Sequence, residues 1–153
     1  MANTYSKLVF HIVFAVKYRK ALINHEVKPE LEKYICGMFL KRNLKVLCIN
    51  CMPDHVHLLI SFKPSYNLDQ IMKEVKVAST LFVRKKFPEL KSFQWQIGYG
   101  SFSCNPMDLK GIFHYIQNQE QHHARKGFKQ EFRDMLRDHD VEHDTHYTFD
   151  DPE

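Results

Sequence analysis

Residues 44–62 constrain the fold of this chain most strongly. Two runs of apolar and β-branched residues are separated here only by Pro53 and Asp54, and so short a connection predicts an antiparallel hairpin. The second run alternates, which places His55 and His57 on one side of its strand and apolar residues on the other. The two predicted strands are residues 44–52 and 55–62.

The remaining elements follow from apolar spacing and from residues that begin or end helices. Asn67 and Asn105-Pro106 are strong helix starts, because each offers a capping side chain. Further strands are predicted at 4–17 and 93–102, and helices at 24–42, 67–87, 105–123 and 129–137. The order βαββαβ followed by a helix predicts an α+β fold, a ferredoxin-like antiparallel sheet with an additional C-terminal helix that carries Tyr115.

Length and composition fit one domain. The chain has 153 residues, of which 44% are hydrophobic and 26% charged, so it can bury a core and still expose a polar surface. We therefore predict a single domain over residues 1–153. Within it, residues 1–124 form the core with the helix of Tyr115, and residues 125–153 form a short helix and a loose tail.

The N-terminus and the cysteines favour a cytoplasmic protein without membrane contact. The first residues lack a charged segment followed by an apolar one, and the apolar run that ends at Val16 is too short to span a bilayer. The 4 cysteines show no disulfide framework. Cys48 and Cys51 have C-x-x-C spacing, but residues three apart on a strand face opposite ways, which argues against a zinc site.

Four polar side chains are candidates for chemistry. His55 and His57 would present two neighbouring imidazoles on one face of a strand, which suits a metal ion. Tyr115 and Gln119 lie one helical turn apart, beside the apolar stripe of their helix. Together these residues indicate a metal-assisted attack by a tyrosine on a phosphodiester.

These motifs resemble a known family. His55-Val56-His57 on the third strand is similar to the HUH motif, and Tyr115-x-x-x-Gln119 on the helix after the fourth strand is similar to the rest of its site. Together they resemble the single-tyrosine HUH transposases of minimal insertion sequences, the TnpA type, and the related repeat-associated tyrosine transposases. The resemblance covers nearly the whole chain. Further matching stretches are residues 11–19, 52–57, 93–96, 115–120 and 122–123.

The resemblance implies an enzyme that cleaves and rejoins single-stranded DNA at hairpins. Tyr115 would attack phosphorus and form a 5′-phosphotyrosine, while His55, His57 and Gln119 would hold a divalent metal, Mg²⁺ or Mn²⁺. Two imidazole ligands favour manganese, whereas the resemblance implies magnesium in cells. It also implies a homodimer in which the tyrosine helix of one subunit can act in trans.

The basic residues are candidates for DNA contact. The formal net charge of +4 permits binding to nucleic acid without demonstrating it. Basic runs at predicted element ends could contact phosphates, and neighbouring aromatic rings could stack on bases. These candidates are Lys17, Arg19, Lys20, Arg84, Lys85, Lys86 and Arg125.

Other interpretations remain open at this point. The same fold could belong to a DNA- or RNA-binding regulator that does not cleave, although such a protein needs neither Tyr115 nor metal ligands. A rolling-circle replication initiator would share the HUH motif but is usually longer. His11, in the first strand, reads as a core histidine whose hydrogen bonds are satisfied.

Overall fold

The computed structural model describes residues 3–123 and 126–143. Its strands are β1 (Leu8–Ala15), β2 (Lys45–Met52), β3 (His55–Phe62) and β4 (Gly100–Ser103). Its α-helices are α1 (Val27–Lys41), α2 (Leu68–Lys86), α3 (Leu109–Gln117), α4 (Gln119–His123) and α5 (Phe128–Asp138). Three short 3₁₀ turns are η1 (Lys17–Arg19), η2 (Pro88–Leu90) and η3 (Pro106–Asp108).

The four strands form one antiparallel sheet in the order β2-β3-β1-β4. This is the strand order that two split βαβ units produce, so the predicted ferredoxin-like α+β fold is confirmed. β1 and β3 are the central strands and are almost fully buried. In the register, His57 lies opposite Asn50 on β2 and Val13 on β1. Side chains opposite one another in a ladder share a face, so Asn50 and His57 project to the same side.

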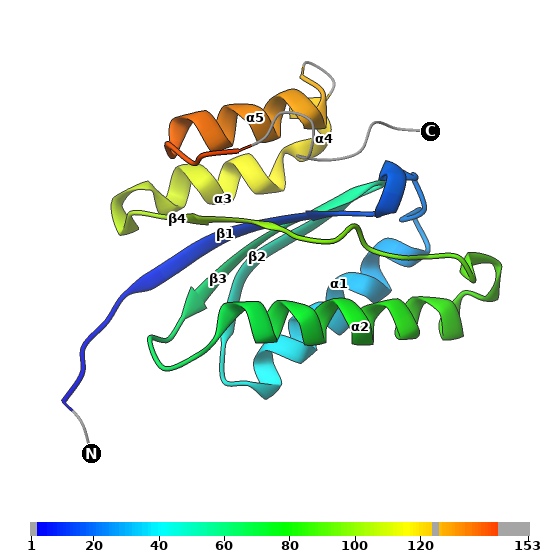
Figure 1. Ribbon diagram of the computed structural model, residues 1–153, viewed down its shortest axis with the longest axis horizontal. Helices are drawn as coiled ribbons and strands as arrows, with labels where there is room; N and C mark the ends of the chain where they lie inside the picture. Colours follow the sequence, from blue (N-terminus) through cyan, green and yellow to red (C-terminus); the bar gives the residue numbers. More distant parts are fainter. Residues whose placement is uncertain (1–2, 124–125, 144–153) are drawn as a thin grey trace.

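The sheet separates two layers of helices (Figure 1). Helices α1 and α2 cover one face, where the larger apolar core includes Phe14, Leu31 and Leu58. Helices α3 and α5 lie over the other face, where smaller clusters include Val13, Phe102 and Phe132. His55 and His57 project to this second face, as their alternation with the core residues of β3 predicted.

Two helix starts follow the sequence. The side chain of Asn67 accepts a hydrogen bond from the backbone N–H of Gln70, which caps α2 as predicted. The side chain of Asn105 accepts from the backbone N–H of Met107, with Pro106 in the first turn. This second start first forms the 3₁₀ turn η3 and only then the α-helix α3.

Three predicted elements differ from expectation. The strand predicted over 4–17 is shorter, because β1 holds only Leu8–Ala15. The strand predicted over 93–102 is wrong for most of its length, because β4 holds only residues 100–103 and Trp95 forms an isolated bridge to Val16. Gly98 has φ +89°, which breaks an extended strand, and the Lys76 ammonium donates to the carbonyls of Gln96 and Gly98. The helix predicted over 105–123 is interrupted after Gln117.

The C-terminal part contains the predicted short helix, which appears as α5. The predicted tail over the last ten residues lies outside the described residues, and the division into one domain with a C-terminal extension stays a prediction. Among residues 3–123 and 126–143, no helix combines the length and the apolar character that crossing a bilayer requires.

Candidate functional site

Two histidines of β3 form the centre of the candidate site. His55 and His57 are 1% and 0% exposed, and their ring centroids lie 5.1 Å apart. They are buried because α5 packs over their face of the sheet, whereas the alternating pattern predicted only their shared direction. Buried imidazoles require polar partners, and His55 and His57 contact different ones.

His57 is held between two polar side chains. Its Nδ1 atom lies 2.9 Å from His11 Nε2, and its Nε2 atom lies 3.1 Å from Glu131 Oε1. Burial, followed by the charge of His57, lowers the pKa of His11 to about 3, so His11 is neutral near pH 7. A neutral His11 can donate from Nε2 to His57 Nδ1. His57 then presents Nε2 as its remaining nitrogen, which is how an outer partner orients a metal-binding imidazole.

A second chain of contacts orients His55. Its Nδ1 atom lies 2.7 Å from Asp54 Oδ1, while Arg19 Nε donates to Asp54 Oδ2 at 3.2 Å. Burial alone would raise the pKa of Asp54, but the hydrogen bonds and charges of His55 and Arg19 together hold it below its ordinary value. The ionised carboxylate therefore fixes the His55 ring through Nδ1, which leaves Nε2 as the nitrogen that could bind a metal.

The tyrosine selected from the sequence lies beside these histidines in the same chain. The Tyr115 ring centroid is 6.0 Å from that of His57 and 6.2 Å from that of His11. Its hydroxyl donates a hydrogen bond to Glu131 Oε2. Burial, and then the charge and hydrogen bond of Glu131, raise the pKa of Tyr115 above its ordinary value. In this arrangement the phenol is therefore protonated at neutral pH.

Gln119 has an environment that fits a ligand oxygen. Its side chain is 0% exposed, and its Nε2 atom donates to the backbone carbonyl of Tyr115 at 3.2 Å. Its buried Oε1 atom accepts no hydrogen bond from residues 3–123 or 126–143. A buried amide oxygen in this state has a free-energy cost, and a metal ion or a bound group would remove that cost.

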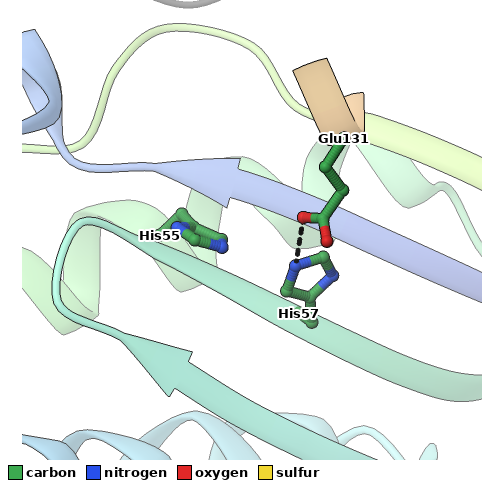
Figure 2. Close-up of side chains that lie close together, drawn as sticks. All are labelled: His55, His57 and Glu131. Atoms are coloured by element: carbon green, nitrogen blue, oxygen red, sulfur yellow. Dashed lines mark hydrogen bonds and ion pairs between the residues drawn. The ribbon is translucent and has the colours of Figure 1, made fainter. Parts of the chain in front are cut away.

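Glu131 is the residue that sequence reasoning missed. It projects from α5 toward His57, as Figure 2 shows, and it is 2% exposed. One ligand atom from each of His55, His57 and Glu131 can be chosen so that all three lie within 4.8 Å of one another. Two imidazole nitrogens and one carboxylate oxygen suit a divalent transition ion, so the residues present fit a metal.

The same helix closes the site. The ring of Phe128, at the start of α5, stacks on His55 with centroids 3.8 Å apart and planes 11° apart. Glu131 follows one helical turn later and contacts both His57 and Tyr115. In this arrangement α5 therefore covers both histidines and leaves them buried.

No sequence signal marked these additional residues. Glu131 lies on a polar helix, where a lone glutamate is usually solvated. Asp54 lies in the predicted connection between two strands and in the matching stretch 52–57, and neither assigns its side chain a partner. His11 is a buried histidine with a satisfied hydrogen bond, as expected, but its partner is the site residue His57. The contacts of all three depend on tertiary packing.

The predicted DNA-contact residues have different surroundings. Arg19 is engaged with Asp54 and lies over the Phe128 ring, so it belongs to the framework of the site. Arg84 donates to the carbonyl of Phe93, and Lys86 forms an ion pair with Glu30. Lys85 is exposed, Lys17 and Lys20 lie over the Tyr18 ring, and Arg125 lies outside the described residues. Their contact with DNA stays a prediction.

Comparisons with known proteins agree on one family. The sequence profile described as "Transposase IS200 like" matches residues 4–119. The ISDra2 transposase TnpA of Deinococcus radiodurans is 33% identical over 89 residues, which are 58% of this chain and 64% of that protein. The transposase of insertion sequence element IS200 from Salmonella typhimurium is 29% identical over 91 residues, 60% of each chain. The matched part thus spans less than two thirds of these relatives.

Two solved structures are similar over most of the chain. A Deinococcus radiodurans R1 protein described as a transposase has a TM-score of 0.66 and 27% identity, and the match covers 78% of this chain and 95% of that one. A REP-associated tyrosine transposase bound to a REP hairpin has a TM-score of 0.60 and 18% identity, with 100% and 96% covered. At that identity the second match supports the fold alone.

Proposed function

Because this chain belongs to the IS200-like transposase family, we propose that it cleaves and rejoins single-stranded DNA through Tyr115. The observation that carries this proposal is that Tyr115, His55 and His57 of one chain meet at a buried polar centre. A regulator that only binds nucleic acid would need neither a tyrosine beside paired imidazoles nor an amide oxygen buried without a partner.

The chemistry assigned to Tyr115 is a transfer of one phosphodiester bond. The phenolic oxygen attacks the scissile phosphorus, the bond from phosphorus to the 3′ oxygen breaks, and that oxygen leaves as a 3′-hydroxyl after taking up a proton. The phosphotyrosine conserves the bond, so a second 3′-hydroxyl can reverse the reaction. At an ordinary pKa near 10, only about one phenol in a thousand is ionised at pH 7.

In the arrangement described here Glu131 raises the pKa of Tyr115. Its carboxylate accepts a hydrogen bond from the protonated phenol, and its negative charge disfavours the phenolate. Withdrawal of α5 would remove the charge and admit the DNA at the same time. A divalent ion held at the site would polarise the phosphoryl oxygen and offset the charge that develops there.

The oxygen ligand of this metal would then depend on the position of α5. With α5 in place, His55, His57 and Glu131 are the three side chains that would hold the ion. With α5 withdrawn, Glu131 leaves with it, and Gln119 on the helical segment next to Tyr115 supplies the oxygen. The buried Oε1 atom of Gln119 supports this second role.

The remaining parts of the proposal rest on the family. We propose that the substrate is a single strand with a hairpin and that the ion is Mg²⁺ or Mn²⁺. A homodimer stays a prediction from the family resemblance. For the tyrosine helix, which that resemblance allows to act in trans, we propose action in cis, since Tyr115 contacts the site residues of its own chain.

A denaturing gel tests the proposal. The protein is incubated with hairpin-containing single-stranded DNA and Mn²⁺, and a covalent protein–DNA adduct is expected. Tyr115→Phe should abolish the adduct. Tyr34→Phe is the matched control, because Tyr34 is also a partly buried helix tyrosine, stacked on Phe82 away from the site. Binding without an adduct across many hairpins would favour the regulator.

A further inference from the structure

The end of the nucleophile helix is held by a side chain from the sheet. Asn50 of β2 is 7% exposed, and its Nδ2 atom donates to the backbone carbonyl of Ile116 at 2.8 Å. Ile116 follows Tyr115 directly and precedes Gln119 by three residues. The last carbonyls of a helix have no partner within the helix, so this bond satisfies one of them.

A lysine from the opposite layer fixes the direction of that amide. Lys28 of α1 donates from Nζ to Asn50 Oδ1 at 2.7 Å. β2 is an edge strand, so a side chain from α1 can contact an asparagine that projects to the other face of the sheet. Because the ammonium can only donate, it requires the amide oxygen on its own side, and the NH₂ group must then face Ile116.

The helix is interrupted directly after this bond. α3 ends at Gln117, Asn118 has φ −101° and ψ 26°, and α4 begins at Gln119. In an unbroken helix the Ile116 carbonyl would accept from the backbone of Glu120. Here two carboxamides satisfy successive carbonyls, since Gln119 bonds the carbonyl of Tyr115 and Asn50 bonds that of Ile116.

We propose that Asn50 is a positioning residue that sets where Tyr115 and Gln119 lie relative to the paired histidines. Asn50 stands opposite His57 in the ladder, so one strand pair fixes both the imidazole and the end of the helix. A shift of the helix end would move the nucleophile and the amide oxygen together. This inference rests on the proposed function where adduct formation is the measurement, and it can be tested without that function by hydrogen–deuterium exchange.

Two substitutions of Asn50 test the positioning role. Asn50→Asp keeps the shape and the acceptor for Lys28 but loses the donor to Ile116, whereas Asn50→Leu loses both polar contacts. For both variants we expect the single-turnover rate of adduct formation to fall roughly ten- to a hundred-fold, the range that misplacement of a reacting group produces. The Kd for hairpin DNA should stay within about two-fold, because the step affected is chemistry rather than binding.

Gln117→Ala is the matched control. It removes a neighbouring contact between α3 and β2, from Gln117 Nε2 to Cys48 Sγ at 3.3 Å, and leaves the Asn50 bonds intact. Its adduct rate should resemble that of the wild type. If Asn50→Asp also keeps the wild-type rate, Asn50 serves packing only and the proposal is wrong.

Hydrogen–deuterium exchange gives a readout without DNA. Exchange over residues 115–121 should accelerate in Asn50→Asp and stay unchanged in Gln117→Ala, at a temperature well below both melting points. Unchanged exchange in Asn50→Asp overturns the positioning role even if no variant has activity. A wild type that forms no adduct while exchange responds as expected would refute the proposed function and leave the positioning role in place.

Discussion

Phe128 lies flat against the imidazole of His55, with ring centroids 3.8 Å apart. The stack joins the first residue of α5 to one of the two proposed nitrogen ligands, and Glu131 joins the same helix to the other. A helix outside the ferredoxin-like core therefore covers both histidines.

Phe128→Ala should loosen this cover. Truncation of a buried phenylalanine costs about 3 kcal/mol or more, and here the loss falls on the docking of α5. We expect a lower Tm and a higher rate of adduct formation per folded molecule, measured in a single turnover. Phe82→Ala, on the other face of the sheet, should not raise the rate. A Phe128→Ala rate at or below that of the wild type would count against a covering role.

Metal binding should depend on different oxygens with and without DNA. In thermal melts of the free protein, Mn²⁺ should raise Tm, and Glu131→Gln should reduce this shift more than Gln119→Ala does. In the adduct assay the order should reverse, with Gln119→Ala losing more activity. Mn²⁺ should also act at lower concentration than Mg²⁺, because imidazole ligands favour it. Greater activity with Mg²⁺ at low concentration would contradict the imidazole ligand set.

Mixing two inactive variants tests whether one chain holds the whole site. Tyr115→Phe lacks the nucleophile, and His57→Ala lacks a ligand. Because Tyr115 and His57 of one chain lie together, the mixture should form no adduct, even after co-expression. A helix acting in trans predicts the opposite, since a mixed dimer would contain one intact site. Recovery of up to about half of the wild-type adduct would therefore establish exchange of the helix.

His11 should make the fold sensitive to acid. Its pKa is about 3 in the folded protein and 6.5 in the unfolded chain, so the unfolded chain binds the proton first as the pH falls. The contribution of His11 to the free energy of unfolding is therefore lost progressively as the pH falls from about 6.5 to about 3. Between pH 7 and pH 5 the loss from this group is roughly 2 kcal/mol.

Urea unfolding at a series of pH values measures this effect. His11→Gln should lower the stability at pH 7, where a buried partner of His57 is altered, yet flatten the decline toward pH 5. His25→Gln replaces an exposed histidine and should keep the slope of the wild type. An unchanged slope in His11→Gln would show that another group dominates the acid response.

The fold was predictable because its signals are local. The alternation around His55 and the short Pro53-Asp54 connection specified the hairpin, and Asn67 specified the start of α2. The strand predicted over 93–102 failed for two reasons. Gly98, with φ +89°, is a local break that the prediction overlooked, whereas the bonds from Lys76 form only once α2 lies beside that segment. The bond from Asn50 to the Ile116 carbonyl beside the interruption was also hidden, since the two residues are 66 positions apart in the sequence.

The site was predictable only in part, for the same reason. Spacing on one strand and on one helix, together with the family resemblance, selected His55, His57, Tyr115 and Gln119 as candidates. Nothing in the sequence around Glu131 distinguishes it from a surface glutamate, and its importance comes from the way α5 lies over the sheet. The contact of Arg19 with Asp54 likewise joins two segments that the sequence separates by 35 positions.

If the proposed function holds, the position of α5 would also affect how strongly the protein binds DNA. A strand that enters only the open form has an apparent Kd equal to its intrinsic Kd divided by the open fraction. An opening cost of about 2.8 kcal/mol would thus weaken binding roughly a hundred-fold. Variation at Phe128 alone could tune occupancy of the DNA while every residue that performs the chemistry stays the same.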